Sequence, residues 1–192
     1  MEELYQKIMN YVPENEQEIN DKRIMLKYLK KFEDIFTREN EMFHFTTSAW
    51  IVNPDRTKVL MIYHNIYDSW AWVGGHADGN SNLLEVVQKE ITEETGLTKV
   101  KLLHNGIFGL SIQTVKAHHK RGKYVSPHLH YDIQFLFEKD DTTKLQIKPD
   151  ENSNVKWIDK ETILEQVTEE HMKPLYDKLI HKVDRLYPYM GK

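Results

Sequence analysis

Residues 82–95, NLLEVVQKEITEET, constrain the fold more than any other segment, because their leucines, valines and isoleucine recur at helical spacing. Gly96 follows them at the position where a glycine commonly ends a helix. On this helix Glu90 and Glu94 fall inside the apolar stripe, and Glu93 lies on its flank. The segment therefore predicts a helix that carries carboxylates on the side that faces the core.

Carboxylates in that position need a counter-charge. Residues three and four apart on a helix are neighbours, so Glu90 lies close to both Glu93 and Glu94. In a half-buried cleft, two like charges ~6 Å apart repel by about 3 kcal/mol. Mg²⁺ suits such a set because it takes oxygen ligands from a few carboxylates and from substrate phosphates. A solvated acidic face is the alternative, but the apolar side of the helix and the upstream Gly74-Gly75, which lets backbone approach a metal or phosphate, favour the metal.

Residues 75–97 resemble the Nudix box, in which a glycine precedes a glutamate, a distant Arg-Glu, a Glu-Glu pair and a second glycine. Gly75 matches the first glycine, and residues 90–97 match the second half without a gap. Ser81 stands where the family has its first glutamate, and it also suits a helix N-cap. Lys89 stands where the family has an arginine that orients the next glutamate; lysine keeps the charge but loses the planar fork.

The resemblance extends from about Phe43 to about Gln166 and implies an α/β fold class. The implied fold is a Nudix-type α/β/α sandwich with a mixed sheet, together with an N-terminal helical extension and a C-terminal helix. We expect residues 1–40 to form the helical extension, packed on the core, and residues 41–192 to form the Nudix domain with its C-terminal helices. The pattern itself predicts strands at 43–52, 59–63, 70–73, 129–137 and 154–158, and one or two more within 99–115. It predicts helices over 2–40, broken at Pro13, and over 160–187, with a break at Pro174.

The chemistry that the resemblance implies is that of a Nudix hydrolase, a phosphoric anhydride hydrolase (pyrophosphatase). It would use Mg²⁺, or Mn²⁺, to cleave a diphosphate linkage in a nucleotide-like small molecule, a nucleoside diphosphate linked to another moiety. Glu151, in a polar turn, is the candidate general base, and Lys89 would orient a box glutamate. The implied metal ligands are Glu90, Glu93, Glu94 and the Gly75 carbonyl, with Glu90 and Glu94 also among the catalytic residues.

Histidines are unusually frequent, at ten in 192 residues. His44 opens the strand predicted at 43–52, and His76 follows the two glycines. His128, His130 and Asp132 share one face of a strand by their period-two spacing, opposite its apolar face. Histidine and carboxylate at such spacing can bind a transition metal. The pattern leaves two alternatives open, a second metal site or polar residues that line a substrate cleft.

Two further functions remain as alternatives. Isopentenyl-diphosphate isomerase resembles this chain at His44-Phe45 and at Gly74-Gly75-His76, and that resemblance implies a second metal site from His44, His76 and His130 or Asp132. Its catalytic cysteine would fall at Gly74, and the chain has no cysteine, so the isomerase is the weaker prediction. A nucleotide-sensing binding module with the Nudix fold is the other alternative, and loss of the box glutamates, which are retained, would favour it.

Charge and hydropathy exclude several partners. A net charge of −4 argues against binding to a nucleic-acid backbone, which needs a basic surface. No apolar run approaches the ~20 residues that span a bilayer. The absence of cysteine fits a reducing compartment. We therefore expect a cytoplasmic protein without membrane or nucleic-acid partners, and the oligomeric state stays open, a homodimer included.

Overall fold

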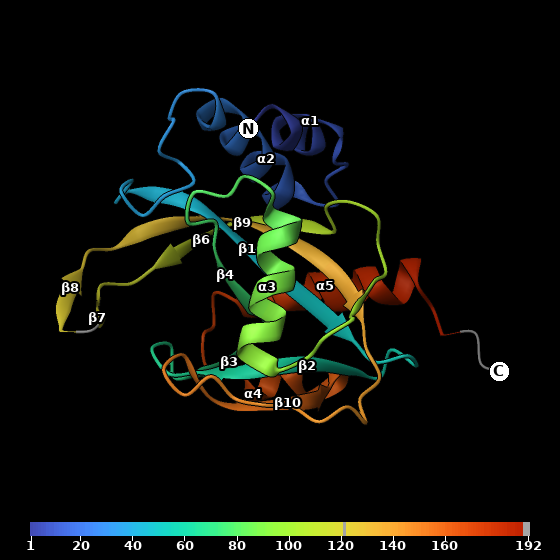
Figure 1. Cartoon of the computed structure of the whole chain (residues 1–192). Helices are drawn as coiled ribbons and strands as arrows, with labels where there is room; N and C mark the ends of the chain where they lie inside the picture. Colours follow the sequence, from blue (N-terminus) through green and yellow to red (C-terminus); the bar gives the residue numbers. More distant parts are fainter. Residues whose placement is uncertain (121, 190–192) are drawn as a thin grey trace. The chain divides into compact units, whose positions relative to one another are not determined.

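The structure is a computed structural model that describes residues 1–120 and 122–189 (Figure 1). The expected domain range 41–192 thus includes positions 121 and 190–192, which lie outside the described residues. The chain forms two compact units, each made of three stretches of sequence. The first comprises Met1–Ser48, Gly74–Val87 and Asn105–Phe135, and the second Ala49–Val73, Gln88–His104 and Leu136–Lys192. Four elements contribute residues to both units: β1 (Phe43–Val52), β4 (Val73–His76), α3 (Leu83–Thr95) and β9 (His128–Glu138).

In the first unit, two helices pack together beside a strand. α1 (Glu2–Asn10) and α2 (Glu16–Leu29) contact one another, as the blue ribbons of Figure 1 show, and α2 also contacts β6 (Gly109–Val115). The Gln17 side-chain amide donates to the Leu110 carbonyl at 3.1 Å, and the Asp21 carboxylate accepts from the Ile112 amide at 2.8 Å. Polar side chains of α2 therefore satisfy backbone groups of β6 that strand pairing leaves open.

The remaining strands of the first unit pair around β1 and β9. β6 pairs antiparallel with β9 over its whole length, and β4 (Val73–His76) pairs with β1. A short hairpin, β7 (His118–Lys120) with β8 (Lys123–Val125), precedes β9.

The helix expected to run as far as residue 40 ends at Leu29. Residues 30–42 form turns, yet Ile35 is fully buried and Phe36 is 6% exposed. The Phe45 amide donates to the Ile35 carbonyl at 2.8 Å, so this segment packs against the start of β1 without helical backbone. The prediction was wrong here because apolar side chains that bury from a turn can mimic helical spacing.

In the second unit, β2 (Lys58–His64) pairs antiparallel with β10 (Asn152–Asp159), with β3 (Ser69–Ala71) and with the end of β1. β5 (Lys101–Leu102) pairs with the end of β9. The C-terminal part comprises η1 (Lys160–Thr162), α4 (Ile163–Gln166) and α5 (Lys173–Leu186). Pro174 lies in the first turn of α5, where its missing amide hydrogen is not needed.

The core of the second unit centres on Tyr176 of α5, which is fully buried. Its ring stacks on Trp50 at 5.7 Å between centroids and meets Trp72 edge-on at 5.0 Å. No helix among the described residues is both long and apolar enough to cross a membrane. The α/β class and the helices near both termini agree with the sequence prediction.

Candidate active site

The three glutamates of the box segment lie on α3, within the second unit. Glu94 is 2% exposed, Glu90 is half-buried and Glu93 is exposed. These exposures agree with the helical wheel, which placed Glu90 and Glu94 in the apolar stripe and Glu93 on its flank. The helix therefore presents carboxylates at three different depths.

The environment of Glu90 disfavours its charged form. Burial raises the pKa of its carboxyl above the ordinary value; the Lys148 ammonium opposes that rise, and the carboxylates of Glu93 and Glu151 add to it. The lysine ammonium groups near Glu90 therefore do not offset the effect of burial and of the neighbouring carboxylates. A hard cation with oxygen ligands fits this donor set.

Lys148, which sequence reasoning missed, lies among these carboxylates. Its ammonium is 3.2 Å from Glu93 Oε2 and 2.9 Å from Glu151 Oε2. Burial alone would lower the pKa of this ammonium, but the ion pairs with Glu151 and Glu93 outweigh burial and raise it above its ordinary value. Those contacts likewise lower the pKa of Glu93, with the Lys148 hydrogen bond as the main cause. The cluster thus already holds one cation, supplied by the chain itself.

The turn that carries Lys148 and Glu151 is fastened to the end of α3. The Gln146 amide donates to the Thr95 carbonyl at 2.9 Å, and the buried Asn152 side chain donates to the Glu94 carbonyl at 3.1 Å. A Cβ on Gly96, which has φ +72°, would lie 2.9 Å from the Gln146 side chain. These contacts explain how residues more than 50 positions apart in sequence come to share one cluster.

Lys89, the expected orienting residue, is largely exposed. Its ammonium lies 3.3 Å from Glu93 Oε1, an i,i+4 pair along α3, with 70% of its side chain accessible. A pair of this kind contributes only about 0.3–0.5 kcal/mol. The orienting role of Lys89 stays a prediction, and Lys148 makes the less exposed contact with the same glutamate.

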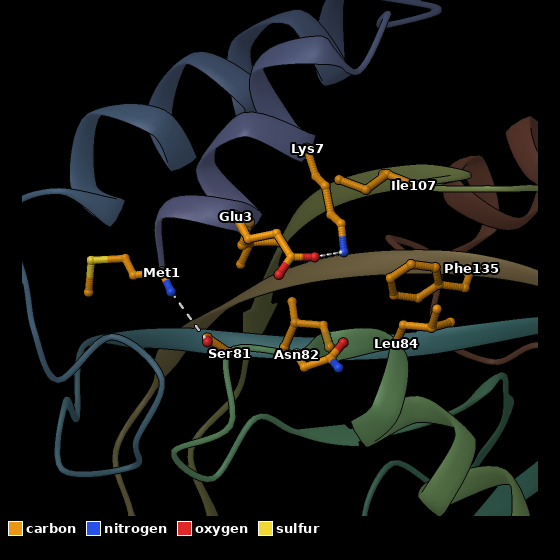
Figure 2. Close-up of a pocket in the computed structure, with 10 residues that line it drawn as sticks. Met1, Glu3, Lys7, Ser81, Asn82, Leu84, Ile107 and Phe135 are labelled. Atoms are coloured by element: carbon orange, nitrogen blue, oxygen red, sulfur yellow. Dashed lines mark hydrogen bonds and ion pairs between the residues drawn. The ribbon is translucent and has the colours of Figure 1, made fainter.

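Ser81 is not the N-cap of α3. The helix begins at Leu83, and the Asn82 carbonyl accepts the first helical hydrogen bond, from Val86 at 3.2 Å. Asn82 is therefore the N-cap, one residue later than predicted. The Ser81 hydroxyl instead accepts a hydrogen bond from the Met1 amine at 3.3 Å, at the edge of a small pocket between α1 and the start of α3 (Figure 2).

Gly74 and Gly75 belong to β4, and the first of them is sterically required. A Cβ on Gly74 would collide with the Thr47 carbonyl oxygen and would lie 2.8 Å from Ser48 Oγ. The close approach of β4 to β1 therefore depends on the missing side chain. Gly75 lies next to it in the first unit, half-buried, and its carbonyl as a metal ligand stays a prediction.

The structure brings four of the predicted histidines together, all in the first unit. Ring centroids of His44 lie 5.1 Å from His76, 5.0 Å from His128 and 5.1 Å from His130. His44, His76 and His130 each offer a ligand atom within 4.8 Å of the others. The period-two spacing on β9 thus gave the correct residues for a cluster, which also includes one histidine each from β1 and β4.

Asp132, the fifth residue of the predicted set, is buried and engaged elsewhere. Its carboxylate accepts from Thr46 Oγ1 at 2.7 Å, from Ser48 Oγ at 2.9 Å and from Gln134 Nε2 at 2.6 Å. Burial raises its pKa, and these hydrogen bonds oppose the rise. The strand expected to be half-buried is in fact buried on both faces from His130 to Phe137, because hydroxyl and amide groups satisfy the polar side chains.

The profile of the NUDIX domain family matches residues 25–179. The chain belongs to this family, and the expected class of enzyme, a Nudix hydrolase, is confirmed. None of the curated protein sequences matches the chain significantly.

Solved structures agree on the fold. An Ap4A hydrolase of C. elegans, in a binary complex, has a TM-score of 0.51 at 16% identity, covering 73% of this chain and 95% of its own. The E. coli dihydroneopterin triphosphate pyrophosphohydrolase has a TM-score of 0.53 at 14% identity, over 71% and 94% of the two chains. The NUDIX domain of Shewanella oneidensis NrtR, complexed with ADP ribose, has a TM-score of 0.51 at 16% identity, over 83% and 96%. The Nudix fold is therefore established for this chain.

Proposed function

We propose that the protein is a Mg²⁺-dependent hydrolase that cleaves a diphosphate linkage in a nucleoside diphosphate linked to another moiety. The observation that carries the proposal is the carboxylate cluster of Glu90, Glu93 and Glu151, in which burial and mutual repulsion disfavour the charge of Glu90. Such a cluster attracts a cation, and a diphosphate brings further oxygen ligands to the same ion. Family membership supplies the reaction class.

Glu90, Glu93 and Glu94 would hold the Mg²⁺, and Mn²⁺ is an acceptable substitute because it prefers the same oxygen donors. When bound, the ion supplies neutralisation of the charge that develops on the diphosphate oxygens. Lys148 lies between Glu93 and Glu151. Its ammonium would then be available to contact the same oxygens from the protein side.

Water must lose a proton when it attacks phosphorus, and two carboxylates compete for the role of acceptor. Glu151 is the predicted base, but its carboxylate is in an ion pair with Lys148 at 2.9 Å and must leave that contact to accept a proton. Glu90 has a pKa raised by burial, which brings a carboxylate closer to the working range of a general base. A Glu151→Gln variant with unchanged turnover at saturating Mg²⁺ removes Glu151 from the mechanism and leaves Glu90.

The substrate class rests on the relatives. The similar structures are named for an Ap4A hydrolase, a dihydroneopterin triphosphate pyrophosphohydrolase and a complex with ADP ribose. All three names refer to a chain of two or more phosphates attached to a heterocyclic moiety. We propose a small molecule of this kind as the substrate.

A substrate panel tests the function. Purified protein would be incubated with dinucleoside polyphosphates, ADP-ribose, nucleotide sugars and nucleoside triphosphates, with Mg²⁺, with Mn²⁺ and with chelator. We expect metal-dependent release of phosphorylated products from at least one compound, and loss of that activity in Glu93→Gln. If the folded protein binds a panel member but turns none over, the binding-module alternative replaces the hydrolase.

A further inference from the structure

The four-histidine cluster lies within the first unit, whereas the box glutamates and Glu151 all belong to the second. Rings from three separate strands meet in it: His44 from β1, His76 from β4, and His128 and His130 from β9. The centroids of His76 and His130 are 4.8 Å apart, and those of His128 and His130 are 5.0 Å apart. The proposed hydrolysis does not use any of these imidazoles.

One nitrogen of His44 has a fixed protonation state. His44 Nδ1 lies 2.9 Å from the Asn40 carbonyl oxygen, and a carbonyl can only accept, so Nδ1 carries the hydrogen. Nε2 is then a lone-pair nitrogen. It is buried and finds no hydrogen-bond partner among the described residues, in a side chain that is 5% exposed. Backbone carbonyls that fix the far nitrogen of a histidine are typical of metal-ligating histidines.

The loop that presents the Asn40 carbonyl is itself held in place. Asn40 Oδ1 accepts from the Phe43 amide at 3.1 Å, and Asn40 Nδ2 donates to Asp34 Oδ1 at 3.1 Å. The orientation of the His44 ring thus rests on a short chain of hydrogen bonds from the turn before β1. That chain pre-positions Nε2 toward the other imidazoles.

The other two rings lie in the same sheltered cluster. His130 is 8% exposed and His76 is half-buried. The nearby Arg38 guanidinium pairs with the Asp78 carboxylate at 2.8 Å, and that carboxylate offsets its charge.

The distances between the three histidines are somewhat longer than those between the ligands of a bound metal. Two nitrogens on one tetrahedral zinc lie about 3.3 Å apart when each Zn–N bond is ~2.0–2.1 Å. The ligand atoms of His44, His76 and His130 lie within 4.8 Å of each other, so small side-chain shifts would bring them to this spacing. His128 Nε2 and His130 Nε2 form a hydrogen bond at 3.2 Å, which a metal bound to His130 through Nε2 would replace.

We propose that His44, His76 and His130 bind one borderline transition-metal dication of the zinc class, at a site separate in chemistry from the carboxylate cluster. Imidazole donors suit Zn²⁺, Co²⁺ and Ni²⁺ and do not suit Mg²⁺. Three protein ligands leave one coordination position open, beside His128, for water or a ligand group. Asp132 is outside the ligand set because Thr46, Ser48 and Gln134 already occupy its carboxylate.

Co²⁺ binding to the wild-type chain is the primary test. The full-length protein would be stripped with chelator and titrated with Co²⁺, with the visible d–d absorption of four-coordinate cobalt as the readout. Zn²⁺ affinity would be measured by competition with a chromophoric chelator. We expect one Co²⁺ per chain with intense visible bands, and their loss when Zn²⁺ is added.

Variants locate the metal. His44→Ala and His76→Ala are expected to weaken Zn²⁺ binding at least about 100-fold, because even indirect partners of ligands change affinity about 10–100-fold. Glu93→Gln tests the carboxylate cluster, and His181→Ala, an exposed histidine of α5, is the matched control; both should bind Zn²⁺ as the wild type does. Circular dichroism and thermal unfolding confirm that each variant is folded.

The outcomes separate this site from the hydrolase. Absence of visible cobalt bands in the wild type overturns the proposal, as does Zn²⁺ affinity that falls in Glu93→Gln and not in the folded histidine variants. The measurements use metal binding and spectra, not turnover, so a failed substrate panel does not bear on them.

Discussion

Replacement of Lys148 by glutamine tests whether this ammonium acts as a built-in cation for the glutamate cluster. It pairs with Glu93 and Glu151, at 3.2 Å and 2.9 Å, from a side chain that is 25% exposed. Lys148→Gln removes this ammonium from the cluster and leaves the exposed Lys89, 3.3 Å from Glu93, as its remaining cation. A bound dication no longer shares the cluster with the Lys148 ammonium. The metal-free variant should therefore be less stable than the wild type, and it should bind Mg²⁺ more tightly.

The magnitude follows from the exposure of the partners. Glu93 is 36% and Glu151 32% exposed, so solvent screens both pairs, and each contributes about 0.2–1 kcal/mol. The summed loss is about 1 kcal/mol, or ~2–4 °C in Tm for a chain of this length. The Lys148 ammonium also repels a cation bound to the same carboxylates. If this repulsion is about 1 kcal/mol as well, Lys148→Gln tightens Mg²⁺ binding about fivefold, since 1.4 kcal/mol corresponds to tenfold.

Denaturant unfolding in chelator measures the first quantity, and Mg²⁺ or Mn²⁺ titration by calorimetry measures the second. Lys160→Gln is the matched control, because Lys160 is 22% exposed and pairs with Asp184 at 2.6 Å in the same unit. The free energy of unfolding of the control should fall by a similar amount, with no change in metal affinity. An unchanged or weaker Mg²⁺ affinity in Lys148→Gln would refute the idea that the ammonium and the metal compete.

Three further predictions concern the surroundings of the site. Asn152→Ala should lower the free energy of unfolding by about 1–3 kcal/mol in denaturant melts, because it leaves the Glu94 carbonyl without its buried donor; a Lys139→Ala variant, altered at an exposed hydrogen bond, serves as control. Gly74→Ala should cost at least about 1–3 kcal/mol, since its Cβ meets backbone of β1; wild-type stability would disprove this close approach. The folded-state pKa of Glu90 is raised, so its contribution to stability is present below the unfolded pKa near 4.5 and is lost as pH rises through the folded value. Metal-free Glu90→Gln should therefore gain stability over the wild type on going from about pH 4 to neutral, and an equal pH dependence of both proteins would contradict the assigned shift.

The helix of the box segment was predictable because local periodicity and burial agree. Of its apolar residues, Leu83, Val86, Val87 and Ile91 are buried and Leu84 is half-buried, and the glutamates inside that stripe are less exposed than Glu93. The segment 30–40 shows the limit of the same reasoning. Its apolar residues are buried as the pattern indicated, but from turns, and hydrophobic spacing does not distinguish the two.

The place of Lys148 in the carboxylate cluster was not predictable from sequence, because one of its two ion-pair partners is far away along the chain. Its link to Glu151 spans three residues, but its link to Glu93 spans 55 and exists only because the turn before β10 is fastened to the end of α3. One signal was present: a lysine three residues from the candidate base in a polar turn. A pair of opposite charges in a turn is ordinarily exposed to solvent. Without the fold, the lysine near Glu151 therefore gives little reason to predict a functional role.

All four histidines of the cluster were among the predicted site residues, but spacing along one strand accounts for only two of them. Period-two spacing placed His128 and His130 on one face of β9, but it could not show that β1 and β4 add one imidazole each to the same face. The same spacing also included Asp132, but its carboxylate accepts hydrogen bonds from two hydroxyl groups of β1. Spacing within a strand selects a face, whereas hydrogen-bond satisfaction decides which members of that face keep a free lone pair.

Donor chemistry gives the two clusters different cations. Around Lys148 the donors are carboxylate oxygens, which favour Mg²⁺ and Mn²⁺, and around His44 they are neutral imidazole nitrogens, which favour the zinc class. A chelator selective for zinc should therefore remove metal from the histidines and leave Mg²⁺-dependent hydrolysis measurable at millimolar Mg²⁺. If hydrolysis then falls and returns only when Zn²⁺ is restored, the imidazole site takes part in the reaction, and the carboxylate cluster alone does not account for the activity.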